Sequence, residues 1–276
     1  MAGFLGMFNF DKPGRGVYKD DPQKRGFFLF FDIYFRKFWR IVSLSLSYTL
    51  GCIPAFIVFF FLNTYVQALF SPITDPAFIT YMGIYITLFL LCFWGAGPVS
   101  AGHAYVLRNF TREDHAWVWD DFWTQVGKNF WQGCGVFVLD IVLFAVLPSA
   151  ACLYILHGSA MPLPPVLSMA LGFLAILFFV IYTMMHFFIY PLMVTLDMKF
   201  GRLLKTALQL TIANLPGCIA IFITSGILFG LFLALYFLHV AFVVLFAALG
   251  FSTVVFAQVF YATDKIDTVL SQIHGE

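Results

Sequence analysis

Long apolar stretches, each about as long as a membrane is thick, constrain the fold of this chain more than any other feature. A helix that crosses the hydrocarbon core needs about 20 mostly apolar residues. Six stretches have this length, at residues 41–63, 78–103, 134–157, 166–192, 215–237 and 239–262. Because the bilayer core offers no water to backbone N–H and C=O groups, such stretches fold as α-helices. The sequence therefore predicts an all-α polytopic membrane protein with six transmembrane helices.

The distribution of Lys and Arg predicts the orientation of these helices. Eight bases precede the first stretch, three lie between the second and third, three lie between the fourth and fifth, and one follows the sixth. The other loops, at residues 64–77, 158–165 and 235–240, contain none. Cytoplasmic loops are enriched in Lys and Arg, so we expect both termini in the cytoplasm. The first 40 residues lack a signal-peptide pattern, which predicts a cytoplasmic tail at 1–26 before a single membrane domain at 27–276.

Composition and motifs exclude several function classes. Only 11% of the residues are charged and the net charge is +1, which argues against a soluble domain and against a nucleic-acid partner. The sequence contains no GxSxG, HExxH, Walker A or GxGxxG motif, the patterns that carry common catalytic or nucleotide chemistry. We therefore expect no enzymatic activity, no cofactor and no metal.

Three amphipathic segments each precede a pair of apolar stretches. They cover residues 27–40, 112–132 and 199–213. The junctions RKFWRI, GKNFWQGC and IANLPGC align, with Phe38, Phe130 and Leu215 separated by 92 and 85 residues. This pattern predicts a threefold repeat of an interfacial helix followed by a membrane hairpin, since internal repeats are common in transport-related membrane folds.

The stretch RNFTREDHAWVWDDFWTQVGKNFWQG holds four of the six tryptophans. Thr111 and Asp114 have capping-box spacing, which predicts a helix start. Two interpretations stay open: an in-plane helix held by tryptophans at the headgroup boundary, or a surface that docks another protein through Asp120 and Asp121. The candidate interface residues are Trp117, Trp119, Asp120, Asp121, Phe122, Trp123, Lys128 and Trp131.

Few polar side chains occur inside the apolar stretches, where such groups often mark functional sites. Asp140 lies about two turns into the third stretch, and His186 lies in the middle of the fourth. Either residue fits a role in a solute pathway. Alternatively, Asp140 reaches back to the interface and His186 bonds to a neighbouring helix.

The stretch GAGPVSAG at residues 95–102 combines small residues with a proline. Small residues four apart let helices cross closely, and proline removes a backbone hydrogen bond. A closely packed, kinked helix and a broken helix that lines a substrate site are both consistent with this pattern. Together with the two ionisable residues, the candidates for packing or a pathway are Gly95, Gly97, Pro98, Gly102, Asp140 and His186.

Three further stretches are specific enough to carry a family resemblance. They are FNFDKPGRGVYKDDPQKRGFFLFFDIYFRKFWRIVSLSL, GAGPVSAGHAYVLRNFTREDHAWVWDDFWTQVGKNFWQG and NLPG at residues 214–217. They resemble the YesL-like family, small bacterial integral membrane proteins with a domain of unknown function. The resemblance implies residence in the bacterial plasma membrane and an association with ABC importers of oligosaccharides. It implies no catalytic residues.

Two functional hypotheses follow. The first is an accessory subunit of a carbohydrate ABC import system, which binds the permease subunits within the membrane and through residues 108–133. The second is a self-sufficient transporter or channel for a sugar or another small solute. Membrane lipids are expected partners in both cases, and the sequence leaves homo-oligomerisation open.

Overall fold

Every regular element of the computed structural model is a helix within the part of the chain that it describes. The described residues are 26–54, 57, 61, 97–156, 163–238 and 246–274. In chain order the helices are α1 (Phe27–Arg36), α2 (Phe38–Gly51), α5 (Pro98–Thr111), α6 (Val118–Lys128), α7 (Phe130–Leu156), α8 (Pro165–Thr195), α9 (Phe200–Ala213), α10 (Leu215–Leu238), the π-helix η3 (Phe246–Gly250) and α12 (Phe251–His274). The predicted all-α fold class is confirmed.

Three segments among the described residues are long and apolar enough to cross a membrane. They are Phe130–Ile155, Pro165–Thr195 and Leu215–Phe232, and they coincide with the third, fourth and fifth predicted stretches. Of the predicted stretch 41–63, residues 41–54, 57 and 61 are described, and the first part of it lies in α2. Most of the predicted stretch 78–103 lies outside the described part. The chain is consistent with a membrane protein, whereas six spans and two cytoplasmic termini stay predictions.

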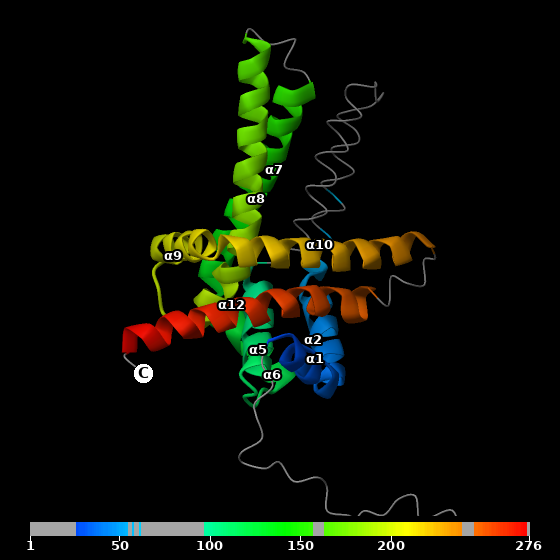
Figure 1. Cartoon of the computed structure of the whole chain (residues 1–276). Coiled ribbons are helices and arrows are strands. Elements are labelled where there is room, and N and C mark those ends of the chain that lie inside the picture. Colours follow the sequence, from blue (N-terminus) through cyan, green and yellow to red (C-terminus); the bar gives the residue numbers. More distant parts are fainter. Residues whose placement is uncertain are drawn as a thin grey trace, which may run out of the picture.

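The longest apolar helices run in two directions. In Figure 1, α7 and α8 run side by side as a hairpin, while α10 and α12 run across its base.

The core lies where α5, α8 and α12 meet at the base of the hairpin. Its largest fully buried side chains include Phe110, Phe188 and Phe256, one from each helix. Within α8, residues 182–193 are all buried, whereas most of residues 165–181 are exposed and apolar. A helix that is apolar all round is suited to a protein core or to lipid, and α8 meets both environments along its length.

Small residues bring α5 against α6 and α7. Gly97 has a φ of 52°, and α5 begins at the next residue with Pro98 in its first position, where the missing N–H would have no helical partner. A Cβ on Gly97 would lie 2.7 Å from the Gly133 carbonyl oxygen, and one on Gly102 would lie 2.6 Å from that of Phe122. The glycine-rich stretch thus contains a helix start with close contacts, rather than a kink inside a continuous helix.

The segment after α5 differs from its prediction. Thr111 caps no new helix, because it ends α5 and its hydroxyl donates to the Arg108 carbonyl oxygen at 2.7 Å. α6 begins only at Val118, and the carboxylate of Asp121 accepts a hydrogen bond from the Trp117 backbone N–H at 2.8 Å. The prediction of a helix start at Thr111 was wrong. The carboxylate that accepts a backbone hydrogen bond at the start of α6 belongs to Asp121, seven residues after Asp114.

Three joints between helices share one backbone geometry. A single residue joins α1 to α2, α6 to α7 and α9 to α10, namely Lys37, Asn129 and Asn214. The φ and ψ angles at these residues are −103° and 14°, −102° and 17°, and −114° and 28°. Both asparagine side chains donate to the carbonyl oxygen four residues back, at 3.1 and 3.0 Å. The amphipathic segments predicted at 27–40 and 112–132 therefore end earlier than expected, at these joints.

The predicted sixth span also differs from the structure. Residues 239–245 lie outside the described part, and η3 and α12 follow them, with α12 continuing to His274 instead of ending at residue 262. The hydroxyls of Ser45 and Thr49 on α2 donate to the Ala247 carbonyl oxygen of η3, at 2.8 and 3.3 Å. Short π-helical turns are often found at functional sites, and this one ends beside the cavity described next.

Candidate functional site

An ionisable cluster is buried where α7 packs on α8. Asp140 lies on a buried face of α7 together with Val136 and Phe144, at helical spacing. The Asp140 side chain is 0% exposed. Its Oδ1 accepts a hydrogen bond from the Tyr182 hydroxyl at 2.5 Å and forms another with His186 Nε2 at 2.8 Å. The cluster therefore joins a carboxyl, an imidazole and a phenol out of contact with water.

Aromatic rings enclose the imidazole of this cluster. The rings of Phe144, Tyr182 and Tyr190 have centroids 6.0, 5.1 and 5.8 Å from that of His186. Such surroundings have a low dielectric constant, which strengthens the hydrogen bonds and the electrostatic interactions within the cluster. The hydrogen bond between Asp140 and His186 therefore lies in an apolar, aromatic environment.

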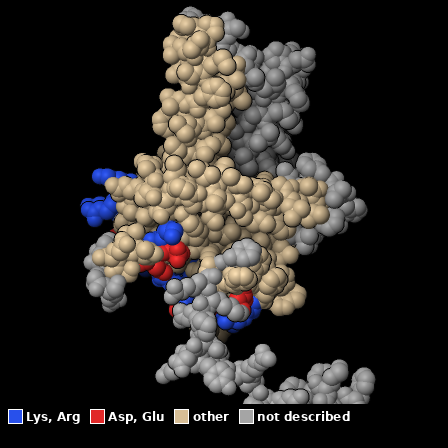
Figure 2. Space-filling view, in the orientation of Figure 1, with Lys and Arg blue, Asp and Glu red and all other residues tan. Residues whose placement is uncertain are grey.

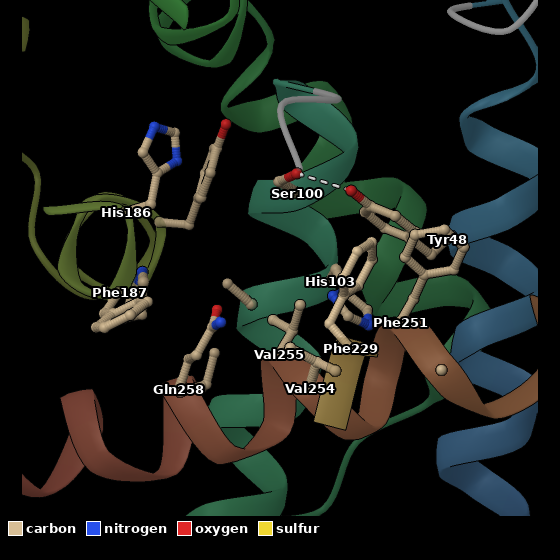
Figure 3. A pocket seen from close by; sticks show the side chains of 15 residues that line it. Tyr48, Ser100, His103, His186, Phe187, Phe229, Phe251, Val254, Val255 and Gln258 are labelled. Atoms are coloured by element: carbon tan, nitrogen blue, oxygen red, sulfur yellow. Dashed lines mark hydrogen bonds between the residues drawn. The ribbon is translucent and has the colours of Figure 1, made fainter. Parts of the chain in front are cut away.

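A cavity of about 50 Å³ lies beside the cluster. Figure 3 shows polar side chains around it from four helices, with Tyr48 from α2, Ser100 and His103 from α5, His186 from α8 and Gln258 from α12, and α10 adds the apolar Phe229. The hydroxyls of Tyr48 and Ser100 lie 3.3 Å apart and are hydrogen-bonded. A buried water needs about 10–15 Å³ of such space and two to four polar partners. The cavity is thus large enough for a few water molecules.

Hydrogen bonds between helices hold the cavity walls together. His103 Nε2 lies 2.8 Å from the Ser252 hydroxyl of α12, and both side chains are buried. The Gln258 amide of α12 donates to the Ser225 hydroxyl of α10 at 3.1 Å. Within the described residues, no group of three His, Cys, Asp or Glu is placed to hold a metal ion.

Three buried polar atoms of this region have no hydrogen-bond partner in the described part of the chain. They are Asp140 Oδ2, His186 Nδ1 and the Tyr190 hydroxyl. Unpartnered buried polar atoms are rare in native proteins, and each costs roughly 1–3 kcal/mol. Because His186 and Tyr190 both line the cavity, a polar species that entered it would reach two of these groups.

Charged side chains lie away from the projecting hairpin. Figure 2 shows them on the lower part of the visible face and none on the α7–α8 arm, in keeping with a sequence that has no Asp, Glu, Lys or Arg at residues 141–196. Arg36 pairs with Glu113 at 2.9 Å, and Arg112 pairs with Asp267. These ion pairs attach the loop between α5 and α6 to α1 and to α12.

The joint between α1 and α2 is attached to the same loop. The Lys37 amine lies 4.8 Å from the centre of the Phe110 ring and donates to the carbonyl oxygens of Phe110 and Asp114, each at 3.4 Å. Burial lowers the pKa of Lys37, and the neighbouring Arg36 adds to this effect. The polar side of the molecule is therefore a connected set of contacts around the loop.

The candidate interface residues divide between exposed and inward-facing positions. Trp117, Trp119 and Trp131 are 69%, 58% and 84% exposed. Asp120 and Lys128 are exposed as well. The inward-facing or half-buried members are Asp121, Phe122 and Trp123. The exposed candidates are thus Trp117, Trp119, Asp120, Lys128 and Trp131, and the interface stays a prediction.

The structure brings together two of the candidate pathway residues. Asp140 and His186 are 46 positions apart in the sequence and share a hydrogen bond. In the glycine-rich stretch, Gly97 and Gly102 make close helix contacts. Ser100 is the residue of this stretch that lines the cavity, among those described. The described candidates of the stretch are Gly97, Pro98 and Gly102. Gly95 lies outside the described residues.

Sequence reasoning missed several cavity residues. Tyr48 and Gln258 both line the cavity. The spacing of polar residues in their helices did not indicate which helix face would point inward. A usable signal was present in α8, where Tyr182, His186 and Tyr190 follow one another at four-residue spacing and therefore share one face. That face is the one that meets Asp140 and the cavity.

The middle of the chain is similar to a described family. Residues 77–150 match "Protein of unknown function, DUF624". The matched region includes α5, α6, much of α7 and the buried Asp140. The resemblance to the YesL-like family is consistent with this match. No curated protein and no solved structure matches the chain.

Proposed function

We propose that this protein carries a small polar solute across the membrane through the cavity between α5, α8 and α12. The observation that supports it is the convergence of polar side chains from four helices on one cavity beside a buried carboxyl. Polar and ionisable groups within membrane segments are costly, and they commonly mark substrate or ion pathways. Helices from distant parts of the sequence supply these groups, as expected for a pathway between helices.

The size of the cavity favours the smaller of the two solute classes that the sequence left open. Sites for drug-sized ligands are about 300–1,000 Å³, whereas this cavity measures about 50 Å³. A sugar would require the helices to separate, with loss of the hydrogen bonds of His103 and Gln258. A solute of a few heavy atoms fits with less rearrangement.

Uptake into liposomes that contain only this protein tests the proposal. We expect entry of at least one small neutral solute, such as glycerol, urea or an amino acid, measured with radiolabelled compounds. Ser100→Leu fills the cavity and should reduce uptake to that of empty liposomes. Thr224→Leu, at an exposed position of α10, is the matched control and should leave uptake unchanged. Absence of uptake across the whole panel, with correctly inserted protein, contradicts the proposal.

A second function has its own supporting observation, the exposed surface at the start of α6. Trp117, Val118, Trp119 and Asp120 line a shallow depression there, and interface hot spots are enriched in tryptophan. We propose on this basis that the protein acts as an accessory subunit of a carbohydrate ABC importer and docks its permease through this depression. Tryptophans at the headgroup boundary of the membrane account for the same exposure, so the test must measure binding.

Co-purification with the permease subunits tests the second function. Reversing both Asp120 and Asp121 would confuse docking with folding, because Asp121 accepts the hydrogen bond from the Trp117 N–H. Asp120→Lys should release the permease while the protein stays in the membrane, and Lys128→Glu at the other end of α6 should not. Equal recovery of permease with wild type and Asp120→Lys counts against this surface.

The proposed topology includes six spans with both termini in the cytoplasm of a bacterium, in the plasma membrane. It also includes the threefold repeat and membership of the YesL-like family. The three joints at Lys37, Asn129 and Asn214, with nearly equal backbone angles, support the repeat. Accessibility of single cysteines to a membrane-impermeant reagent, placed at residues 26, 114 and 271, tests the orientation, since all three should be protected from the outside.

A further inference from the structure

Asp140 has one partner that can neutralise its charge. Its Oδ1 is hydrogen-bonded to Tyr182 and to His186, and no Lys or Arg among the described residues pairs with it. The side chains of Asp140 and His186 are 0% and 2% exposed. An ionised carboxyl without a partner is very costly in an apolar medium. The pair therefore has to be considered as one unit.

This unit is electrically neutral when it holds one proton beyond a carboxylate and a neutral imidazole. The proton can reside on Asp140, as a carboxylic acid beside imidazole, or on His186, as an imidazolium beside a carboxylate. Both arrangements have no net charge, and the hydrogen bond between Nε2 and Oδ1 at 2.8 Å exists in either. Removal of the proton leaves one negative charge on the buried pair.

No other charged group surrounds the pair in the described structure. On α8 the neighbouring titratable groups are Tyr182 and Tyr190, and on α2 the nearest one is Tyr48. On α5 and α12 the side chains that line the adjacent cavity include His103 and Gln258, and no Asp, Glu, Lys or Arg lines it. Among the described neighbours, no charged side chain therefore favours the proton on Asp140 over the proton on His186.

The unit also has a route for exchange. His186 lines the cavity, and its Nδ1 has no hydrogen-bond partner in the described part, like Asp140 Oδ2 and the Tyr190 hydroxyl. A few waters fit the cavity, and water can bridge polar groups nearly as well as a direct hydrogen bond does. A proton can therefore leave His186 from Nδ1 to water in the cavity while Nε2 keeps its contact with Asp140.

We propose that Asp140 and His186 form a proton-binding site whose single proton exchanges through the cavity and couples solute movement to the proton gradient. The coupling rests on the transport function proposed above, whereas the proton site does not. A solute that enters the cavity meets His186, the member of the pair that lines it, and a hydrogen-bond acceptor on the solute would take up the departing proton. Tyr182 then holds the carboxylate through its own hydrogen bond.

Infrared difference spectroscopy of the full chain in lipid tests the proton site. Spectra recorded at successive pH values should contain the carbonyl stretch of a protonated carboxyl where the proton resides on Asp140, or imidazolium bands that His186→Gln removes where it resides on His186, and either signal should disappear at high pH. Asp140→Asn should remove the carboxyl band, and Asp140→Glu should shift it without removing it. Asp197→Asn, at an exposed position, should leave it unchanged. Thermal unfolding of each variant verifies that it is folded.

A proton-flux measurement tests the coupling. Liposomes with a trapped pH-sensitive dye should acidify when an inward proton gradient and a transported solute are both present. In Asp140→Asn and His186→Gln the flux should fall to that of protein-free liposomes, and Asp197→Asn, at an exposed position, should behave like wild type.

The outcomes separate the two proposals. A carboxyl band that Asp140→Asn leaves unchanged overturns the proton site, even if solute uptake is observed. An Asp140 band that titrates without any solute uptake supports the site and contradicts the transport function. Solute uptake whose rate is the same with and without a proton gradient, and the same in wild type and Asp140→Asn, overturns the coupling and leaves the transport proposal supported.

Discussion

The two parts of the α7–α8 hairpin have nearly the same apolar composition and opposite surroundings. The inner part, residues 130–144 and 182–195, packs against α5, α9 and α12 and contains the buried cluster. In the outer arm, residues 146–155 and 165–181, all positions except Ala151, Ser168, Gly172 and Ala175 are exposed or half-buried. Hydropathy does not separate the two parts, because lipid and protein core both accept apolar side chains. Their contacts separate them, and the difference should appear in how each part tolerates substitution.

The largest expected difference concerns two phenylalanines of α8. Phe188 is fully buried and Phe178 is 53% exposed. Phe188→Ala should lower the free energy of unfolding by about 3–5 kcal/mol, because it removes a ring from a packed core and leaves a cavity. Phe178→Ala should cost little, since lipid fills the space. SDS titration in detergent micelles, followed by circular dichroism, measures both. Equal losses would mean that the outer arm packs against something else.

The next difference concerns two hydrogen bonds that join α7 and α8. In the inner part Tyr182 donates to Asp140, and in the outer arm the Ser168 hydroxyl donates to the Tyr154 carbonyl oxygen at 2.7 Å. Tyr182→Phe should cost about 1.5–3 kcal/mol, as for hydrogen bonds to charged groups. Ser168→Ala should cost about 0.6 kcal/mol, the average for membrane helices. The same titration compares them, and a Ser168→Ala loss as large as that of Tyr182→Phe would remove the distinction.

The smallest difference concerns two glycines at helix contacts. A Cβ on Gly133 would lie 2.5 Å from the Pro98 backbone nitrogen, whereas one on Gly172 would lie 2.5 Å from Cγ1 of the Ile155 side chain. Because backbone atoms cannot move away by changing rotamer, Gly133→Ala should lower the free energy of unfolding by about 1–3 kcal/mol through overpacking. Gly172→Ala should cost less, because the half-buried isoleucine can change rotamer. A Gly172→Ala loss that exceeds the Gly133→Ala loss would show that the outer arm is the more rigid part.

Some of the helices could be predicted from the sequence because their signal is local. Long apolar runs determined the third, fourth and fifth stretches to within a few residues, and the period of polar residues determined α9. The start of α6 could not be predicted, because two acids at plausible capping positions, Asp114 and Asp121, compete. Only the fold shows that Asp121 is the one that accepts a hydrogen bond from a backbone N–H at the helix start. The positions of the joints at Lys37 and Asn129 likewise depend on where each helix meets its neighbours.

The candidate site divides in the same way. The sequence by itself determined that Asp140 and His186 are unusual, because polar groups are costly in apolar stretches wherever these pack. Only the tertiary structure decided that the two residues meet, and that Tyr48 and Gln258 lie around the same cavity. Hydropathy and spacing describe each helix along its own axis. The rotation of one helix against another, which makes a pair or separates it, depends on side chains from distant parts of the chain.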